Sequence, residues 1–201
     1  LLLEIIIFEK IINLKNIAIF ASGKGTNAEN ICSYFKGSNV ARVALLCSNK
    51  KDAPVISHLK KHSVPTLVFS KNDMNFSDLL EKKLAKNSID LIVLAGFLLK
   101  IPKKIIHLYD KKIINIHPSL LPKYGGKGMY GKYVHESVLK NNELESGITI
   151  HFVNENYDDG DIILQKNCVL SRKETIKSLS DKIHSLEMSF FPKAIEKILL
   201  S

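Results

Sequence analysis

Two side chains that can take part in acyl transfer, Asn115 and His117, lie two residues apart at the end of a strand-like run, INIHP (114–118). Residues two apart on a strand project from the same face. An amide beside an imidazole suits acyl transfer, because the amide can donate a hydrogen bond to a developing oxyanion while the imidazole handles protons. The alternative is a structural histidine whose ring is satisfied by a backbone carbonyl.

Two neighbouring carboxylates, Asp158 and Asp159, lie in NENYDDG (154–160), between two further strand-like runs. Asp-Gly is expected in a solvent-exposed turn for conformational reasons alone. Alternatively, one of the two carboxylates lies against His117, where it would orient the ring and favour its charged form. The residues by themselves do not decide between these interpretations.

A short glycine loop, SGKGTN (22–27), follows the first strand-like run and opens a helix-like segment. Backbone N–H groups at a helix N-terminus favour anions, and glycines allow a ligand to approach closely. The loop is too short for a P-loop and lacks the third glycine of a dinucleotide fingerprint. It therefore favours a single phosphate over a nucleotide pyrophosphate. A tight turn that binds nothing is the alternative.

Alternating strand-like and helix-like segments must position these residues. We expect strands at 16–21, 40–49, 64–69, 89–97 and 112–117, with helices at 28–37, 53–63, 76–88 and 102–111. Continuous apolar runs suit parallel strands covered on both faces. Beyond Pro118 we expect a loop rich in Pro and Gly, a helix at 133–142, two strands within 146–170, and a helix from Glu174 that is kinked or broken at Pro192. The pattern predicts an α/β fold with a doubly wound, mainly parallel sheet and a C-terminal strand pair and helix.

Composition indicates a globular protein. The 201 residues are 45% hydrophobic and 24% charged, and no segment resembles a membrane span. The net charge of +9 comes from scattered lysine pairs, which suit solvated helix faces better than a nucleic-acid groove. Three dispersed cysteines and histidines without ligand spacing favour a reduced, cytoplasmic, metal-free protein. We expect an N-terminal extension over residues 1–14, a single domain over 15–201, and a monomer or homodimer.

Four blocks of this sequence, in order, resemble the folate-dependent phosphoribosylglycinamide formyltransferase family. The blocks are IAIFASGKGTNAENI, VLAGFLLKIP, INIHPSLLPKY and GITIHFVNENYDDGDIILQ, and the resemblance runs from about Lys15 to Leu200. It implies a Rossmann-like formyltransferase fold. It also implies transfer of the formyl group of the co-substrate 10-formyltetrahydrofolate to glycinamide ribonucleotide in purine biosynthesis, with no metal involved.

The resemblance further implies roles for individual residues. Asn115, His117 and Asp158, rather than Asp159, would be catalytic, and Asp158 would keep the imidazole charged. The substrate phosphate would bind at the glycine loop, through Gly23, Lys24, Gly25, Thr26 and Asn27, and the ribose at Glu187. The folate would bind along one segment and at the catalytic amide, through Leu98, Leu99, Lys100, Ile101 and Asn115.

Three features depart from the family pattern. Leu98-Leu99 replaces Met-Arg, Lys71-Asn72-Asp73 lacks an Arg that would meet the folate tail, and the loop YGGKGMYGKYVHES is longer and lacks the usual His motif. The alternatives are a formyltransferase acting on methionyl-tRNA or an amino sugar, a formyltetrahydrofolate hydrolase, and a nucleotide- or RNA-binding module. The phosphate loop favours the ribonucleotide as acceptor.

Overall fold

The computed structural model describes residues 14–201. These residues form two compact units. The first comprises the described residues through Leu99 together with Ile195–Ser201, and the second comprises Lys100–Ala194. The extension predicted over residues 1–14 lies, apart from Leu14, outside the described residues, and the single domain over 15–201 stays a prediction.

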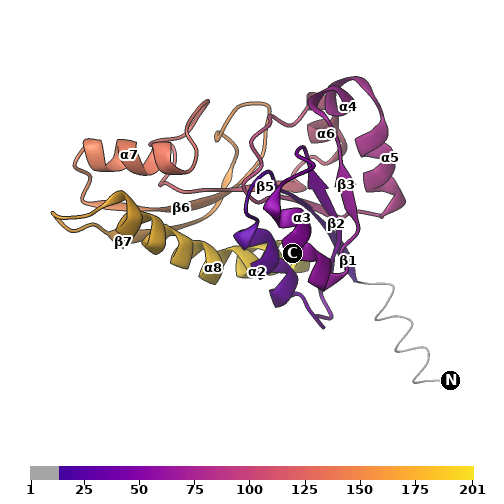
Figure 1. Ribbon diagram of the computed structural model, residues 1–201, viewed down its shortest axis with the longest axis horizontal. Helices are drawn as coiled ribbons and strands as arrows, with labels where there is room; N and C mark the ends of the chain where they lie inside the picture. Colours follow the sequence, from indigo (N-terminus) through magenta and orange to yellow (C-terminus); the bar gives the residue numbers. More distant parts are fainter. Residues whose placement is uncertain (1–13) are drawn as a thin grey trace. The chain divides into compact units, whose positions relative to one another are not determined.

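The first unit is built on parallel strands in the order β3-β2-β1-β4. Figure 1 shows α2 and α3 on one side of these strands and α5 on the other, so that both faces are covered. The strands are β1 (Lys15–Phe20), β2 (Ala41–Ser48), β3 (Thr66–Val68) and β4 (Leu91–Leu94). The helices are α2 (Thr26–Tyr34), α3 (Pro54–Leu59), the 3-10 helix η1 (Lys60–His62), α4 (Lys71–Phe76) and α5 (Leu79–Lys86).

The burial of these strands explains why their sequences are continuous apolar runs. Every residue of 17–20 in β1 is fully buried, and the paired residues of β4 are nearly so, with Ile17 opposite Leu91. Parallel strands lie between helices on both faces, so apolar side chains are needed in both directions. The predicted α/β class with parallel, doubly covered strands is confirmed.

One helix in this unit, α4, was not predicted from the sequence. Ser70 caps it: the Ser70 hydroxyl accepts from the Asp73 N–H at 3.0 Å, and the Asp73 carboxylate accepts from the Ser70 N–H at 2.7 Å. This reciprocal arrangement satisfies two backbone donors that a helix start leaves open. A Ser followed three residues later by Asp was the signal that could have revealed the helix.

The second unit contains antiparallel strands in the order β5-β6-β7. The strands are β5 (Ile113–His117), β6 (Glu145–Phe152) and β7 (Ile162–Val169); the helices are α6 (Lys103–Leu108), α7 (Lys132–Lys140) and α8 (Ile176–Leu200), which belongs to this unit through Ala194. Figure 1 shows α8 running beside the β6–β7 hairpin. The Lys182 ammonium donates to the Val169 carbonyl at 3.0 Å, which ties the helix to the hairpin.

Of the predicted kink or break at Pro192, the break is wrong, because α8 continues through this residue; the kink stays a prediction. A proline in a helix removes one backbone hydrogen bond and crowds the preceding turn. Phe191 and Ile195, on either side of the proline, are fully buried. Burying side chains of this size stabilises by about 1.5–3 kcal/mol each, which is comparable to the cost of the proline. None of the helices in residues 14–201 combines the length and the apolar character needed to span a bilayer.

A buried histidine in α7, His135, makes the stability of the protein depend on pH. Its side chain is 5% exposed, and within the described part of the chain its Nδ1 has no hydrogen-bond partner. Burial lowers its pKa, because the charged ring would lose its hydration. Below the unfolded-state pKa of about 6.5, the unfolded chain takes up a proton that the folded chain resists, so the free energy of unfolding falls as the pH falls.

We therefore expect His135→Leu to lose less stability than the wild type when the pH is lowered from about 7.5 to about 5.5. Urea unfolding of both proteins at the two pH values measures this difference. Equal losses would show that His135 does not contribute.

Candidate active site

The carboxyl end of β5 presents Asn115 and His117 beside the antiparallel strand β6. In the register of the two strands, Asn115 lies opposite His151 and His117 lies opposite Thr149. His117 is 3% exposed. The strand pairing therefore places a polar side chain of β6, His151 or Thr149, opposite each of the two residues predicted from the sequence.

The two ring nitrogens of His117 have different surroundings. Nε2 lies 2.8 Å from the Tyr124 carbonyl oxygen, and because a carbonyl only accepts, Nε2 carries a proton. Nδ1 lies 3.5 Å from Oδ2 of Asp158. The neutral ring therefore presents an unprotonated Nδ1 toward the carboxylate, and the charged ring presents an N–H there.

Asp158 is fixed before any substrate arrives. Its Oδ2 accepts from the Gly126 N–H at 2.9 Å, and its Oδ1 lies 3.4 Å from Nδ2 of Asn115. Asp158 has φ +52°, a left-handed conformation that Asp and Asn tolerate better than most residues. Asn115, His117 and Asp158 thus form one cluster of candidate catalytic residues, referred to below as the catalytic cluster.

Asp159 lies elsewhere in the same connection. Its carboxylate accepts from the side-chain amides of Asn156 at 3.0 Å and Asn154 at 3.2 Å, and these bonds lower its pKa. Of the two candidate carboxylates, Asp158 is the one beside the imidazole. Asp159 instead folds the connection between β6 and β7.

Side chains of α6 and of the segment before it contact the connection between β6 and β7. The Glu155 carboxylate pairs with the Lys103 ammonium, which is the main cause of its lowered pKa, and with Nε2 of His107 at 3.1 Å. The Lys100 ammonium lies 5.4 Å from the centre of the Tyr157 ring. These contacts flank Asp158 and restrict the segment that carries it.

A buried polar network holds the segment that supplies the Tyr124 carbonyl. Oγ1 of Thr149 donates to the Ser119 carbonyl at 2.7 Å and accepts from the Leu121 N–H at 3.0 Å. The Gln165 amide donates to the same Oγ1 and to the Leu121 carbonyl, both at 2.9 Å. Thr149 is fully buried. These bonds fix the turn after β5, and so the partner of His117.

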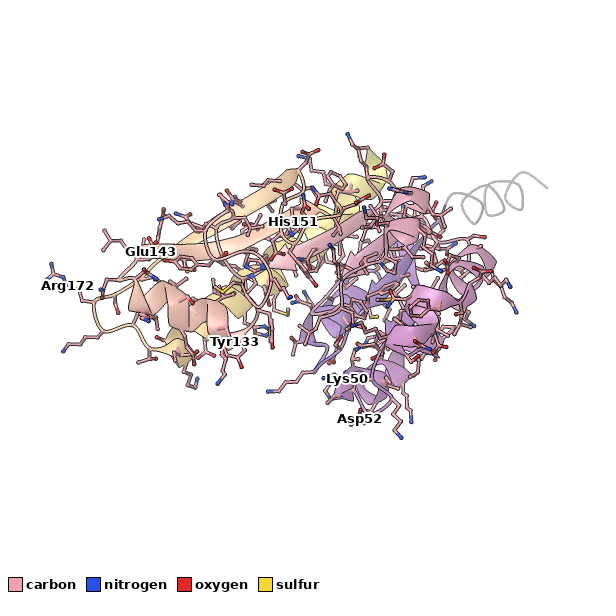
Figure 2. All side chains as sticks on the ribbon, turned by 90° about the horizontal axis from the view of Figure 1, so that it is seen from above. Lys50, Asp52, Tyr133, Glu143, His151 and Arg172 are labelled. Atoms are coloured by element: carbon pink, nitrogen blue, oxygen red, sulfur yellow. The ribbon has the colours of Figure 1, made fainter. Side chains whose placement is uncertain are left out.

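His151 adds a second imidazole to the cluster. Its Nε2 lies 3.2 Å from Nδ2 of Asn115 and 3.7 Å from Oδ1 of Asp158. Burial is the main cause of its lowered pKa, opposed by its bond to the Phe152 carbonyl and by the Asp158 charge. Figure 2 shows His151 on its strand, far along the hairpin from Glu143 and Arg172.

The predicted phosphate loop lies in the first unit, where α3 shapes it. Gly25 precedes α2 with φ +79°, and a Cβ built there would lie 2.2 Å from Cγ2 of Val55. The Val55 N–H donates to the Gly23 carbonyl at 3.1 Å, and Nδ1 of His58 lies 2.9 Å from the Lys24 carbonyl oxygen. The carbonyls of Gly23 and Lys24 are thus hydrogen-bonded to residues of α3. Gly23, Lys24 and Thr26 are exposed to solvent just before and at the start of α2.

The predicted folate segment follows β4. The backbone N–H of Leu98 lies 3.3 Å from the Ser22 hydroxyl, and the Ser22 N–H donates to the Gly96 carbonyl at 3.1 Å, which joins this segment to the phosphate loop. Leu98 and Lys100 are exposed, Leu99 is half-buried and Ile101 is buried. The boundary between the units falls after Leu99, so Lys100 and Ile101 belong to the second unit.

Glu187, the predicted ribose contact, lies on α8 in the second unit. One of its carboxylate oxygens lies 3.9 Å from Nδ1 of His184, one turn earlier on the helix. Its side chain is 15% exposed.

This chain is similar to known proteins in sequence and in fold. A family model described as formyl transferase matches residues 15–195. The chain belongs to the formyl transferase family. The phosphoribosylglycinamide formyltransferase of Bacillus subtilis is 35% identical over 92% of this chain and 95% of that protein. A crystal structure of phosphoribosylglycinamide formyltransferase from Bacillus halodurans has a TM-score of 0.82 and 33% identity, covering 92% of this chain and 95% of that one.

Plant relatives of this formyl transferase are longer than the chain itself. The chloroplastic phosphoribosylglycinamide formyltransferase of Arabidopsis thaliana is 38% identical over 92% of this chain, which covers 65% of that protein. The corresponding protein of Vigna unguiculata is 34% identical, and 61% of it is covered. The chain therefore spans less than two thirds of these two relatives.

All three residues of the cluster in this formyl transferase were candidates from the sequence, whereas the residues that support them were not. The missed residues contact the catalytic cluster or hold the turn beside it: Tyr124, Gly126, Thr149, His151 and Gln165. The alternation of polar Thr149 and His151 along β6 was the available signal, since residues two apart share a face.

Proposed function

We propose that this chain transfers the formyl group of 10-formyltetrahydrofolate to the amine of glycinamide ribonucleotide, giving formylglycinamide ribonucleotide and tetrahydrofolate in purine biosynthesis. The observation that carries this proposal is the cluster of Asn115, His117 and Asp158, with Nδ1 of His117 3.5 Å from the carboxylate. An amide donor, an imidazole and a carboxylate are the groups needed to stabilise a tetrahedral oxyanion and to move protons. Relatives named for the same reaction support it.

The proposed reaction is a direct transfer. The amine nitrogen of the ribonucleotide attacks the formyl carbon and forms the C–N bond of a tetrahedral intermediate. Nδ2 of Asn115 and the protonated Nδ1 of His117 donate to the oxyanion, and Asp158 balances the charge of the ring. The attacking amine loses a proton through a water at Asp158, the folate nitrogen gains one, and the bond between that nitrogen and the formyl carbon breaks.

The two substrates would be held by separate elements. The phosphate of the ribonucleotide would accept from the backbone N–H groups of residues 23–27 at the start of α2, with Lys24 adding a positive charge. Glu187 would accept from a ribose hydroxyl. The folate would lie on the backbone of 98–101 and on Asn115. Correct orientation of two reactants is worth effective molarities of about 10⁵ M or more.

Tetrahydrofolate release from 10-formyltetrahydrofolate, measured with and without glycinamide ribonucleotide, tests this proposal. Release that requires the ribonucleotide supports it. Release without any acceptor would overturn it in favour of a hydrolase. Turnover with an amino sugar or methionyl-tRNA, and none with the ribonucleotide, would assign a different acceptor.

The phosphate loop has its own test in Gly25→Ala. The new Cβ would meet Val55 and the positive φ would be strained, so the loop N–H groups would move. We expect the KM for glycinamide ribonucleotide to rise by about tenfold or more, because one lost charge-assisted hydrogen bond is worth about 1.5–3 kcal/mol.

Gly37→Ala is the matched control for this variant. Gly37 has a similar φ of +75°, but nothing lies within 4 Å of a Cβ at that position. It therefore adds comparable backbone strain without a clash. Equal KM values in both variants would argue against a phosphate site at the loop. Unchanged affinity of Gly25→Ala for oligonucleotides would separate ribonucleotide binding from an RNA-binding role.

A further inference from the structure

His151 contacts the catalytic cluster but takes no part in the proposed reaction. It is 2% exposed, lies on β6 directly opposite Asn115 in the strand register, and has its Nε2 3.2 Å from the Asn115 amide nitrogen. Side chains directly opposite on antiparallel strands are near neighbours. The contact is therefore built into the pairing of β5 with β6.

The protonation of the His151 ring follows from its second contact. Nδ1 lies 2.8 Å from the backbone carbonyl oxygen of Phe152. A carbonyl has no proton to give, so Nδ1 must carry the hydrogen. A buried, neutral imidazole with a protonated Nδ1 has a lone pair at Nε2, and the lowered pKa of the ring agrees with this neutral form.

An acceptor at Nε2 fixes the orientation of the Asn115 carboxamide. If the amide were turned over, its oxygen would face the Nε2 lone pair, and two buried acceptors would oppose each other. We propose that His151 is a positioning residue that holds the Asn115 amide with its NH2 group toward Asp158, so that the formyl oxygen meets a donor and not a carbonyl. This inference rests on the proposed formyl transfer.

The two hydrogens of the Asn115 amide then have separate functions. One is held by His151 at 3.2 Å throughout the reaction, and the other faces Oδ1 of Asp158 across a longer 3.4 Å contact. A long hydrogen bond is weak, so replacing it by a bond to the substrate oxygen costs less free energy than replacing the shorter one. The hydrogen that faces Asp158 is the one delivered to the oxyanion, while the amide stays anchored on β6.

Two substitutions of His151 test the proposal. His151→Leu has similar bulk and no acceptor, and its kcat should fall by about 10- to 100-fold, less than the loss of about 10²–10³-fold for a missing oxyanion donor, because the Asn115 amide itself remains. KM values for both substrates should stay within about twofold, because the contact acts in the transition state. His151→Gln can offer an amide oxygen to Asn115 and should recover most of the loss. Urea unfolding of both variants verifies that they fold.

A double-mutant cycle with Asn115→Ala separates positioning from a general structural effect. If His151 acts through Asn115, adding His151→Leu to Asn115→Ala should lower kcat by no more than about twofold further. Fully additive losses would overturn the proposal. So would a His151→Leu enzyme with wild-type kcat, or a His151→Gln enzyme as impaired as His151→Leu.

A measurement independent of activity distinguishes failure of this inference from failure of the proposed function. Nitrogen-15 NMR of the histidine rings in the full chain should show His151 protonated at Nδ1 and unprotonated at Nε2 at neutral pH, with the Nε2 signal changed in Asn115→Ala. A proton on Nε2 would overturn the inference even in an active enzyme. An inactive wild type with the expected tautomer would count against the proposed reaction instead.

Discussion

Replacing His117 by Ala is expected to lower kcat for formyl transfer by about a thousandfold and to leave the KM for glycinamide ribonucleotide within about twofold. The ring lies against Asp158 through Nδ1 and donates from Nε2 to the Tyr124 carbonyl, so its orientation is fixed in the absence of substrate. Proton handling by a positioned side chain is worth about 10²–10⁴-fold, and an oxyanion donor about 10²–10³-fold. The two contributions overlap in one side chain and do not simply multiply.

The control for this variant must separate chemistry from folding. His117→Ala also leaves a small cavity and a carbonyl without its donor, so the urea midpoint should be measured alongside tetrahydrofolate release. His62→Ala, in η1 of the first unit, is a histidine change outside β5 and should keep wild-type kcat. A loss of less than about tenfold in His117→Ala would assign the proton transfer to another group.

The second large effect is expected for Asp158→Asn, which removes the charge and keeps the shape. Asn tolerates the φ of +52° as well as Asp does, so the connection should fold normally. The NH2 group of the new amide at position 158 can only donate, and it will face either the Gly126 N–H or the Asn115 NH2 group, which are also donors. One of the two hydrogen bonds to residue 158 is therefore lost. We expect kcat to fall by about 10²–10³-fold, because the proposed reaction would lose the counter-charge that Asp158 supplies beside the ring.

The pH–rate profile decides what Asp158 does. If the carboxylate sustains the charged form of His117, the wild-type profile contains an ionisation that the Asp158→Asn profile lacks. Asp159→Asn is the matched control, because that carboxylate is bonded to Asn154 and Asn156 outside the catalytic cluster. A variant profile of the same shape as the wild type would show that Asp158 acts by geometry alone.

The parts of the fold that follow from local periodicity could be predicted from the sequence. The apolar runs of the first unit gave the parallel strands, and the two-residue spacing of Asn115 and His117 placed them on one face of β5. Each of these inferences needs only the geometry of one strand. The helix α4 was missed because its signal is a cap and not a hydrophobic period.

The supports of the cluster could not be predicted, because they depend on contacts distant in sequence. His151 meets Asn115 across 36 positions, and only the strand register brings them together. Thr149 is chemically an ordinary strand residue until two backbone groups of the turn after β5 and the Gln165 amide bond to its hydroxyl. The break at Pro192 was wrongly predicted for the opposite reason, since burial of the neighbouring side chains outweighed a local rule.

The pairing of β5 with β6 limits where natural relatives can differ in length. One residue inserted or deleted in β6 before His151 would place an apolar neighbour opposite Asn115 and turn the imidazole to the other face of the strand. Residues 127–131, between the Gly126 contact and α7, carry no such restriction. We expect insertions and deletions among relatives to gather there and single-residue ones to be absent from β6.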